Sequence, residues 1–367
     1  MTILDLLYSR GIKPQRVATT KGGEYQSPCP LCQGRDCFHA WPSQGEGGTW
    51  WCRRCDKGGD LIEFLRHFDG LSFPEACRRL GLEKNLEYRR LPVPARRARA
   101  ETFSGVDRPQ PPAAWLEKAE KLIAAAEKAI FDQHQVLTWL ERRGLEAVDV
   151  AAHRLGWLPG DKDQGCCWRP RSAWGLEDIE TERDGVKRLR KKLWIPRGLV
   201  IPTLIGGRAA ALRLRLTEAD RKRWSFDKKY YVVPGSFLAP LVAVSSRLAG
   251  RPRAWVVVES QLDALMVAER CADSHPIRPV GAMAMLSNTG KPCPRSHQLL
   301  AAAERVLVAL DYDLAGKKGA DWWLKTYRQA VRWPVPQGKD PGEYFALGGN
   351  IHEWINEGLP SNLKVGI

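Results

Sequence analysis

Four cysteines near the amino terminus have the spacing of metal ligands. Cys29 and Cys32 form one Cys-x-x-Cys pair, and Cys52 and Cys55 form a second pair after nineteen intervening residues. Each pair can point two thiolates at one ion, and the hairpin between them can complete a tetrahedron around Zn²⁺. Because four thiolates leave no open coordination position, we expect this zinc to be structural.

Two alternatives to this ligand set stay open in the sequence. The four cysteines could be thiols without a metal, and Cys37 or His39, which lie inside the hairpin, could replace one of them. Other cysteines lack ligand spacing and are expected to be small, partly buried residues. These are Cys77, Cys166, Cys167, Cys271 and Cys293.

Acidic residues follow two apolar runs in the carboxyl-terminal third. One run ends at Glu259, with Asp263 four residues later, and another ends at Asp311 and Asp313. The carboxyl ends of parallel strands share one edge of a sheet, so these side chains should converge. Gathered carboxylates repel one another unless cations lie among them, which predicts catalytic Mg²⁺ or Mn²⁺ bridging to phosphates. For Asp263 the alternative is an acid in the first turn of a helix, stabilised by the helix dipole.

The charge of the chain is strongly positive and locally concentrated. The net charge is +15, and residues 187–230 contain fourteen Lys or Arg against three acidic residues. This balance favours a polyanionic partner such as nucleic acid or an anionic membrane surface. A solvated basic face without a partner is the alternative, but Arg213 and Arg215 alternate along an expected strand and so share one face.

Aromatic residues are interleaved with cations around the second cysteine pair. Aromatic rings beside cations suit single-stranded nucleic acid, because bases stack on the rings and phosphates pair with the charges. Strand alternation would instead bury every second ring in the core of a small module. The aromatic residues are Phe38, Trp41, Trp50 and Trp51, and the cations are Arg35, Arg53, Arg54 and Lys57.

The elements that must position these groups fall into distinct segments. Residues 1–88 are expected to form a zinc-binding domain, and residues 89–112, rich in Pro and Arg, an extended and mobile linker. Residues 113–245 are expected to form a basic subdomain and residues 246–367 a second subdomain. Apolar strand-like runs alternate with helical stretches from Arg188 onward, which predicts an α/β fold.

No run of about 18 apolar residues is present, and the first residues lack a signal-peptide pattern. A cytoplasmic location is therefore expected by default, and the family resemblance given next implies that the cell is a bacterium or is infected by a phage.

The stretch from Cys29 to Leu82 resembles the zinc-binding domain of DnaG-type bacterial and phage primases. The two Cys-x-x-Cys pairs and the trailing pattern match the phage and plasmid branch, whereas the main bacterial branch uses one His ligand. Related phage domains usually carry Arg at the position of Cys37, which argues against an essential role for that thiol. The trailing pattern consists of Gly59, Asp60, Phe64, Ser72, Phe73, Glu75 and Ala76.

The acidic segments resemble the Toprim domain that DnaG-type primases share with topoisomerases and related nucleases. The matching segments are VVVES, LDAL, GAMAMLSNTGKPCP, VLVALDYDLAGKKGA and VPQGKDPGEY, within about 100 residues. The resemblance implies that Glu259, Asp311 and Asp313 are catalytic and hold the metal ions. It also implies that Asp340 lies near the metal site and that Asp263 matches a second acidic residue after the catalytic glutamate.

The resemblance therefore implies a DNA primase that makes RNA primers from NTPs on a single-stranded DNA template. The implied architecture is a zinc ribbon followed by a mixed α/β polymerase core with a Toprim subdomain. WLERRGL and LRLRL…KKYYVVPGS fit the basic half of that core. Expected template or nucleotide contacts are Arg143, Arg213, Arg215, Lys228, Lys229, Lys317 and Lys318.

Two other classes stay open. One is a Toprim nuclease or topoisomerase-like enzyme, although none of the eight tyrosines has the context of a topoisomerase nucleophile. The other is a catalytically silent adaptor that binds single-stranded DNA. The sequence contains no G-x₄-G-K-[ST] motif, so no helicase is expected within this chain. A replicative helicase on a separate chain, or a longer parent protein, stays open.

Overall fold

The structure is a computed structural model of the 367-residue chain. It describes residues 1–19, 22–44, 47–55, 57–71, 73–81, 103, 105–106, 109–162, 164–183, 186–245, 247, 250–272, 280–287, 289–310 and 314–364. Asp311 and Asp313 lie outside the described residues, as do the side chains of Lys317 and Lys318. No helix in these ranges combines the length and the apolar character needed to cross a bilayer.

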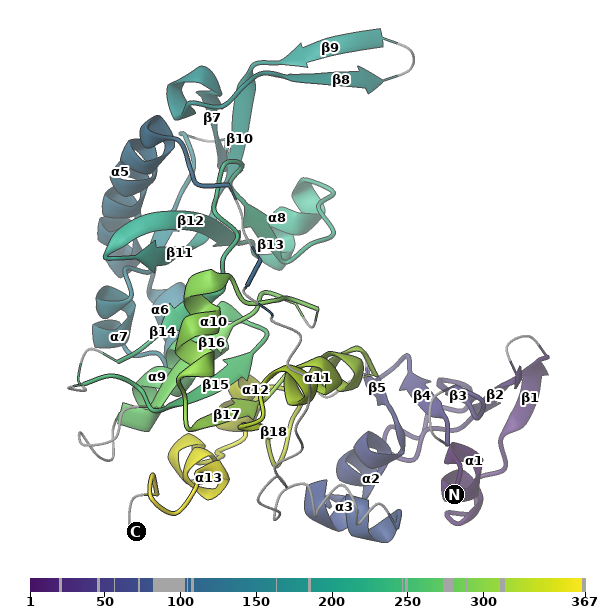
Figure 1. Ribbon diagram of the computed structural model, residues 1–367. Coiled ribbons are helices and arrows are strands. Elements are labelled where there is room, and N and C mark those ends of the chain that lie inside the picture. Colours follow the sequence, from purple (N-terminus) through teal and green to yellow (C-terminus); the bar gives the residue numbers. More distant parts are fainter. Residues whose placement is uncertain are drawn as a thin grey trace.

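The amino-terminal unit is an antiparallel five-stranded sheet flanked by short helices (Figure 1). Its strands follow chain order, so each one pairs with the next through a hairpin. The elements are α1 (Ile3–Tyr8), β1 (Gln15–Ala18), β2 (Glu24–Ser27), β3 (Phe38–Trp41), β4 (Thr49–Cys52), β5 (Lys57–Gly59), α2 (Leu61–Asp69) and α3 (Phe73–Arg79).

Aromatic residues of β3 and β4 alternate between the two faces of this sheet. Phe38 and Trp50 are buried, and their rings stack with centroids 5.4 Å apart. Phe64 of α2 packs edge-on against both rings. Trp51 is 39% exposed on the opposite face. Strand alternation therefore makes Phe38 and Trp50 core residues and leaves Trp51 accessible.

The second unit has a four-stranded antiparallel sheet in the order β13-β12-β11-β6. Helix α5 covers this sheet through Trp115, Ala119 and Ile123. Two further strand pairs, β7 with β10 and β8 with β9, extend from it (Figure 1). The elements are α5 (Ala113–Ala129), η2 (Ile130–Asp132), α6 (His134–Glu141), α7 (Ala147–Ala152), β6 (Gly156–Leu158), β7 (Cys166–Pro170), η3 (Ser172–Trp174), β8 (Ile179–Arg183), β9 (Val186–Arg190), β10 (Lys192–Pro196), β11 (Gly198–Ile205), β12 (Arg208–Arg215), α8 (Glu218–Arg223) and β13 (Tyr230–Val232).

The third unit contains a sheet in the order β14-β16-β15-β17-β18, in which all pairs except β14 with β16 are parallel. The predicted alternation of strands and helices is thus confirmed, and the chain is a mixed α/β protein. The elements are β14 (Leu241–Ala243), β15 (Ala254–Val258), α9 (Gln261–Ala272), β16 (Val280–Ala284), α10 (Pro294–Ala301), β17 (Arg305–Val308), α11 (Leu314–Thr326), β18 (Ala330–Arg332), α12 (Pro341–Ala346) and α13 (Ile351–Gly358).

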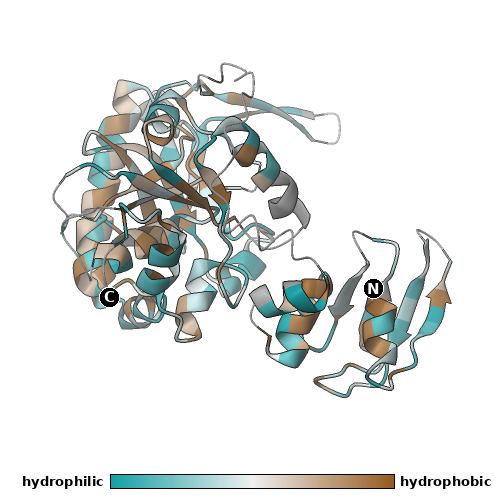
Figure 2. Ribbon diagram, turned by 60° about the horizontal axis from the view of Figure 1, so that its bottom comes forward, coloured by the Kyte–Doolittle hydropathy of each residue, from teal (hydrophilic) through white to brown (hydrophobic). Residues whose placement is uncertain are grey.

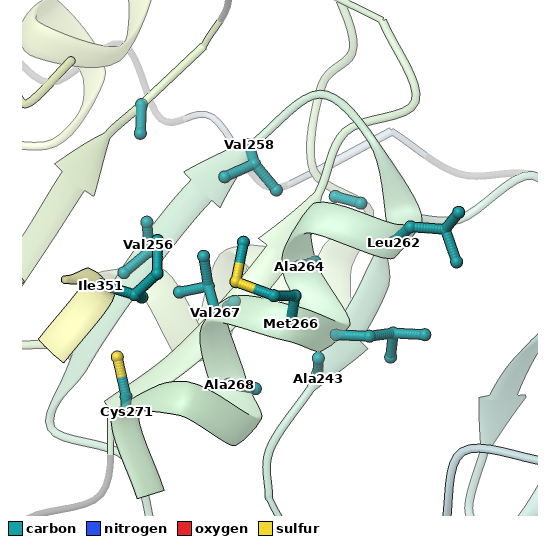
Figure 3. Close-up of a cluster of buried hydrophobic side chains, with 14 of the residues drawn as sticks. Ala243, Val256, Val258, Leu262, Ala264, Met266, Val267, Ala268, Cys271 and Ile351 are labelled. Atoms are coloured by element: carbon teal, nitrogen blue, oxygen red, sulfur yellow. The ribbon is translucent and has the colours of Figure 1, made fainter. Parts of the chain in front are cut away.

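Every residue of β15 is buried, as expected for a parallel strand covered on both faces. Val256 and Val258 belong to one buried cluster with α9 and α13, shown in Figure 3. Trp255 and Val257 belong to another cluster with α10 and α11. Hydrophobic and hydrophilic residues are interspersed along the helices of the chain (Figure 2).

The second and third units share a continuous core. Ile201 of β11 lies in the same buried cluster as Val256, Leu262 and Ala243. A buried hydrogen bond of 3.1 Å from Gln261 Nε2 to Thr203 Oγ1 also joins them. Strand β14 already belongs to the third sheet, so this sheet begins before the predicted boundary at residues 245–246.

Part of the predicted linker lies against the core. The ring of Phe103 is 5.3 Å from that of His297 and 5.1 Å from that of Trp322. The Val106 N–H donates to the Pro292 carbonyl oxygen over 2.9 Å. The carboxyl-terminal part of this segment is therefore anchored, whereas residues 82–101 lie outside the described residues.

Truncation of Ile201 tests the shared core. Ile201→Ala should lower the free energy of unfolding by about 2–5 kcal/mol, because the side chain is fully buried between the two units. Denaturant titration followed by tryptophan fluorescence measures this loss. The control is Val148→Ala, at a residue 60% exposed, which should change the free energy by less than about 0.5 kcal/mol. Two separate core transitions, with only one of them shifted, would contradict a common core.

Candidate metal centres and nucleic-acid interface

The two cysteine pairs come together beside the first sheet. The sulfur atoms of Cys29, Cys32, Cys52 and Cys55 all lie within 4.8 Å of one another. The Sγ–Sγ distances are 3.8 Å from Cys29 to Cys55 and 3.8 Å from Cys32 to Cys52. A tetrahedron with Zn–S bonds of about 2.3 Å has edges of about 3.8 Å. The donor set therefore fits a structural zinc ion, as its spacing predicts.

Cys37 and His39 are positioned as neighbours of this set. Cys37 Sγ lies 3.5 Å from Cys32 Sγ and 3.6 Å from Cys52 Sγ. Burial raises the pKa of the Cys37 thiol to about 12, whereas the Gly34 backbone hydrogen bond lowers the pKa of Cys32 to about 6. His39 Nδ1 is 2.6 Å from Glu24 Oε1. Cys37 thus suits a protonated thiol that lies beside the ligand sulfurs and donates to the Gly34 carbonyl oxygen over 3.3 Å, and His39 is engaged elsewhere.

Three of the predicted acidic residues are described, and they lie at the ends of different elements. Glu259 follows β15, and its carbonyl oxygen accepts from the Leu286 N–H over 3.0 Å. Asp263 is in the first turn of α9, and Asp340 is the N-cap of α12, where it accepts from the Glu343 N–H over 2.7 Å. Asp340 therefore caps helix α12, independently of any role in metal binding.

Gly342 allows Asp263 and Asp340 to approach each other. A Cβ added to Gly342 would lie 2.6 Å from Asp263 Oδ1 and 3.5 Å from Asp340 Oδ1. Arg143 Nη1 would be 3.1 Å from the same added atom, and it forms an ion pair of 3.7 Å with Asp263 Oδ1. The Asp263 carboxyl thus points toward α12 and Arg143. Stabilisation of the dipole of α9 does not by itself account for these contacts.

The Asp263 carboxyl is held in an unfavourable environment for its charge. Its side chain is 5% exposed. Burial, followed by the negative charge of Asp340, raises the pKa of Asp263 to about 7, and the charge of Arg143 opposes this rise. A buried carboxyl beside a second carboxyl suits a hard divalent cation, which would neutralise both. The described acids do not bring three ligand atoms within 4.8 Å of one another, as the four cysteines do.

Several of the predicted basic residues stack on aromatic rings next to these acids. The guanidinium carbons of Arg143 and Arg215 each lie 4.8 Å from the centroid of a ring of Trp139. Arg215 Nη1 donates to the Tyr230 hydroxyl over 2.8 Å, and Arg213 lies 4.4 Å above the Tyr230 ring. Stacking of this kind fixes the planar groups in place while leaving their N–H donors available.

Electrostatic effects link this basic cluster to the acids. Burial lowers the pKa of Arg213, and the negative charge of Glu259 opposes the change. The pKa of Lys229 is also lowered, first by desolvation and then by Lys339, Arg215, Arg221 and Arg143. The structure therefore brings Arg143, Arg213, Arg215 and Lys229 together, whereas Lys228 is exposed without a described contact to the cluster.

Several members of this site were not predicted from the sequence. Trp139 and Tyr230 lie inside the motifs that drew attention to Arg143 and to the basic strand, and Lys339 directly precedes Asp340. A search for aromatic neighbours of the predicted arginines would have found both rings. The role of Gly342 depends on how closely α12 approaches α9, for which the sequence carries no local signal.

Comparison with known proteins supports the amino-terminal assignment. Residues 24–62 match the family model for the zinc-binding domain of primase-helicase. The predicted resemblance of this domain to primase zinc-binding domains is thereby confirmed. No curated protein sequence matches the chain.

Two solved structures are similar to the chain over most of its length. The zinc-binding and RNA polymerase domains of Aquifex aeolicus primase are 17% identical, with a TM-score of 0.41, covering 97% of this chain and 83% of that one. The primase fragment of the bacteriophage T7 primase-helicase protein is 14% identical, with a TM-score of 0.38, covering 91% and 98%. These TM-scores are too low to define a common arrangement of the whole chain.

Replacement of individual cysteines tests the zinc site. Cys52→Ser should abolish stoichiometric zinc binding and unfold the amino-terminal sheet, because structural zinc contributes directly to folding. Cys37→Ser should retain about one zinc per chain, since the tetrahedron is complete without this sulfur. Metal analysis of the purified proteins measures both. Loss of zinc from Cys37→Ser would show that Cys37 is a ligand.

Replacement of Asp263 tests its buried charge. The pKa is about 7 in the folded protein and near the ordinary value of 3.8 in the unfolded chain. Above pH 7 the carboxylate is charged in both states and its burial opposes folding fully. Below pH 4 it is protonated in both states and this cost is absent. Asp263→Asn should therefore stabilise the protein at pH 8, by at most about 4 kcal/mol, and progressively less as the pH falls.

Thermal unfolding at pH 8 and pH 5 without added divalent cations measures this difference. Asp178→Asn, at an exposed residue, is the control and should show no such dependence on pH. A stabilisation of Asp263→Asn that is equal at both pH values would contradict the burial of a charged group.

Proposed function

We propose that this protein is a DNA primase, an enzyme that synthesises short RNA primers from NTPs on single-stranded DNA. The observation that carries the proposal is the combination, in one chain, of a primase-type zinc ribbon with an acidic and basic site at the edge of a parallel sheet. Template-directed nucleotidyl transfer needs both halves of this site, one for divalent ions and one for phosphates.

The basic cluster would bind the phosphates of template and nucleotide. Arg143 and Arg215 share the Trp139 ring, and Arg213 stacks on Tyr230. Guanidinium groups fixed in this way can donate two parallel hydrogen bonds to phosphate oxygens. Lys229 adds positive charge beside them. Lys228, Lys317 and Lys318 are proposed as further contacts on the sequence argument alone.

The acidic residues would hold the catalytic Mg²⁺ or Mn²⁺. Glu259 and Asp263 are the described candidates, with Asp340 beside Asp263 and with Asp311 and Asp313 assigned from the sequence. Divalent ions bound there would stabilise the negative charge that develops on the attacking and leaving oxygens. Arg143, paired with Asp263, would hold that carboxyl in place, and its guanidinium would provide positive charge near the acids when no metal is bound.

The reaction would join two nucleotides without a covalent enzyme intermediate. The 3′-hydroxyl of one nucleotide attacks the α-phosphorus of an NTP and loses its proton. A phosphodiester bond forms, the bond between the α-phosphorus and the bridging oxygen breaks, and pyrophosphate leaves. Positioning of the substrates by the basic cluster would supply much of the protein's contribution to the reaction rate, because the attacking and leaving oxygens must be in line.

The zinc-binding domain would engage the template. On the exposed face of its sheet, His39 lies directly opposite Trp51 and its ring stacks with that of Trp41, with centroids 6.2 Å apart. Flat aromatic surfaces of this kind stack on unpaired bases. A replicative helicase on a separate chain or in a longer parent protein is part of the proposal, because primases act where duplex DNA is being opened.

Primer synthesis on single-stranded DNA tests the proposal. Wild-type protein with labelled NTPs and Mg²⁺ or Mn²⁺ should produce short oligonucleotides on templates of varied sequence. Glu259→Gln and Asp311→Ala should reduce the yield by at least about 100-fold, since removal of a group that stabilises transition-state charge typically costs this much. Gel electrophoresis of the products measures the yield.

The matched control is Glu357→Gln, at an exposed residue of α13, which should leave synthesis unchanged. DNA cleavage in place of synthesis would favour a Toprim nuclease. DNA binding without either activity would favour a silent adaptor.

A further inference from the structure

The hairpin of β8 and β9 extends away from the second unit (Figure 1). The two strands pair in simple antiparallel register from Ile179 opposite Arg190 to Arg183 opposite Val186. Five residues per strand correspond to an arm of about 17 Å. None of the residues assigned to the acidic and basic site belongs to this hairpin.

This arm has little apolar material to stabilise it. Ile179 is 42% exposed and Leu189 is 55% exposed, and neither belongs to a described core cluster. An isolated two-stranded hairpin is only marginally stable in water. An arm that buries so little of its own surface is suited to contact a partner.

Charge is divided unequally between the two faces of the arm. Residues directly opposite one another share a face, so Arg188 and Arg190 lie with Thr181 and Ile179 on one side. Lys187 lies on the other side, where its Nζ is 3.0 Å from Glu180 Oε1. Among the described residues neither Arg188 nor Arg190 forms an ion pair, so their face carries uncompensated positive charge.

We infer that this arginine face binds the sugar–phosphate backbone of single-stranded DNA beyond the catalytic site. Guanidinium groups match phosphate oxygens in geometry and charge, and these two arginines are spaced along one strand so that both can face the same backbone. The described part of the arm contains no aromatic ring on which bases could stack. The contact is therefore independent of sequence and depends on salt.

This inference rests on the proposed function for the identity of the bound strand as the template. The arm would then hold template that has not yet entered, or has already left, the site around Arg143 and Asp263. It would add affinity only for strands long enough to reach both places. The dependence of affinity on strand length therefore distinguishes binding by the arm from binding at the catalytic site.

Opposite charge reversals on neighbouring residues provide the test. Arg188→Glu and Lys187→Glu make the same change in net charge at exposed positions, but on opposite faces of the same strand. Fluorescence anisotropy with labelled oligonucleotides of increasing length, at several salt concentrations and without NTPs, measures the affinity of each variant. Thermal unfolding of both variants shows whether their folds are equally intact.

Arg188→Glu should weaken binding of long strands severalfold and reduce the magnitude of the salt slope by about 0.7 for each phosphate that the arm no longer neutralises. Lys187→Glu should leave the slope unchanged. Binding of a strand too short to reach the arm from the site around Arg143 should be the same for both variants. Equal weakening in both variants would overturn the inference in favour of a general charge effect, and wild-type binding by both would overturn it in favour of a protein partner.

These outcomes are independent of the proposed enzymatic activity. Failure of the arm to bind DNA would leave primer synthesis by Arg188→Glu at the wild-type level on all templates. Failure of the proposed function would remove synthesis from the wild type while leaving the comparison of binding intact.

Discussion

The burial of the Asp263 carboxyl beside Asp340 is the constraint around which the site is arranged. A desolvated carboxylate close to another acid is costly unless positive charge compensates it. Arg143 supplies part of this compensation from the turn after α6, while the absence of a side chain at Gly342 allows α12 to approach α9. Three segments far apart in the sequence must therefore pack correctly before the carboxyls can meet. Under the proposed function, a divalent cation would offset the remaining unfavourable charge.

The shared core supplies the rigidity that this arrangement needs. One buried cluster runs from β11 through β15 and α9 to α13, so the basic strand β12 and the acidic ends of β15 and α9 are held by the same packing. Close-packed interiors resist deformation. The arginines stacked on Trp139 and Tyr230 and the carboxyls opposite them consequently keep their relative positions without depending on loops alone.

The amino-terminal unit is stabilised in a different way. Its sheet is small, and its core depends on a few aromatic side chains, chiefly Phe38, Trp50 and Phe64. Small domains bury too little surface to be very stable by hydrophobic packing alone, and a tetrahedral metal centre compensates for this. With the metal and one face of the sheet supplying stability, the opposite face can present Trp51 to a ligand.

The sequence by itself predicted the two cysteine pairs as zinc ligands, the alternation of strands and helices and the burial of alternate aromatic rings, because each depends on spacing within a short segment. The tertiary structure decided that Phe38 and Trp50 are the buried rings and that the four paired sulfurs lie together. It also predicted Arg143, Arg213 and Arg215 as charged contacts, but their common support on Trp139 and Tyr230 came only from the tertiary structure. The basic block of residues 187–230 looks continuous in the sequence. Antiparallel pairing separates it into an arm at β8 and β9 and a cluster next to Asp263, since long-range register and packing place neighbouring charges on different surfaces.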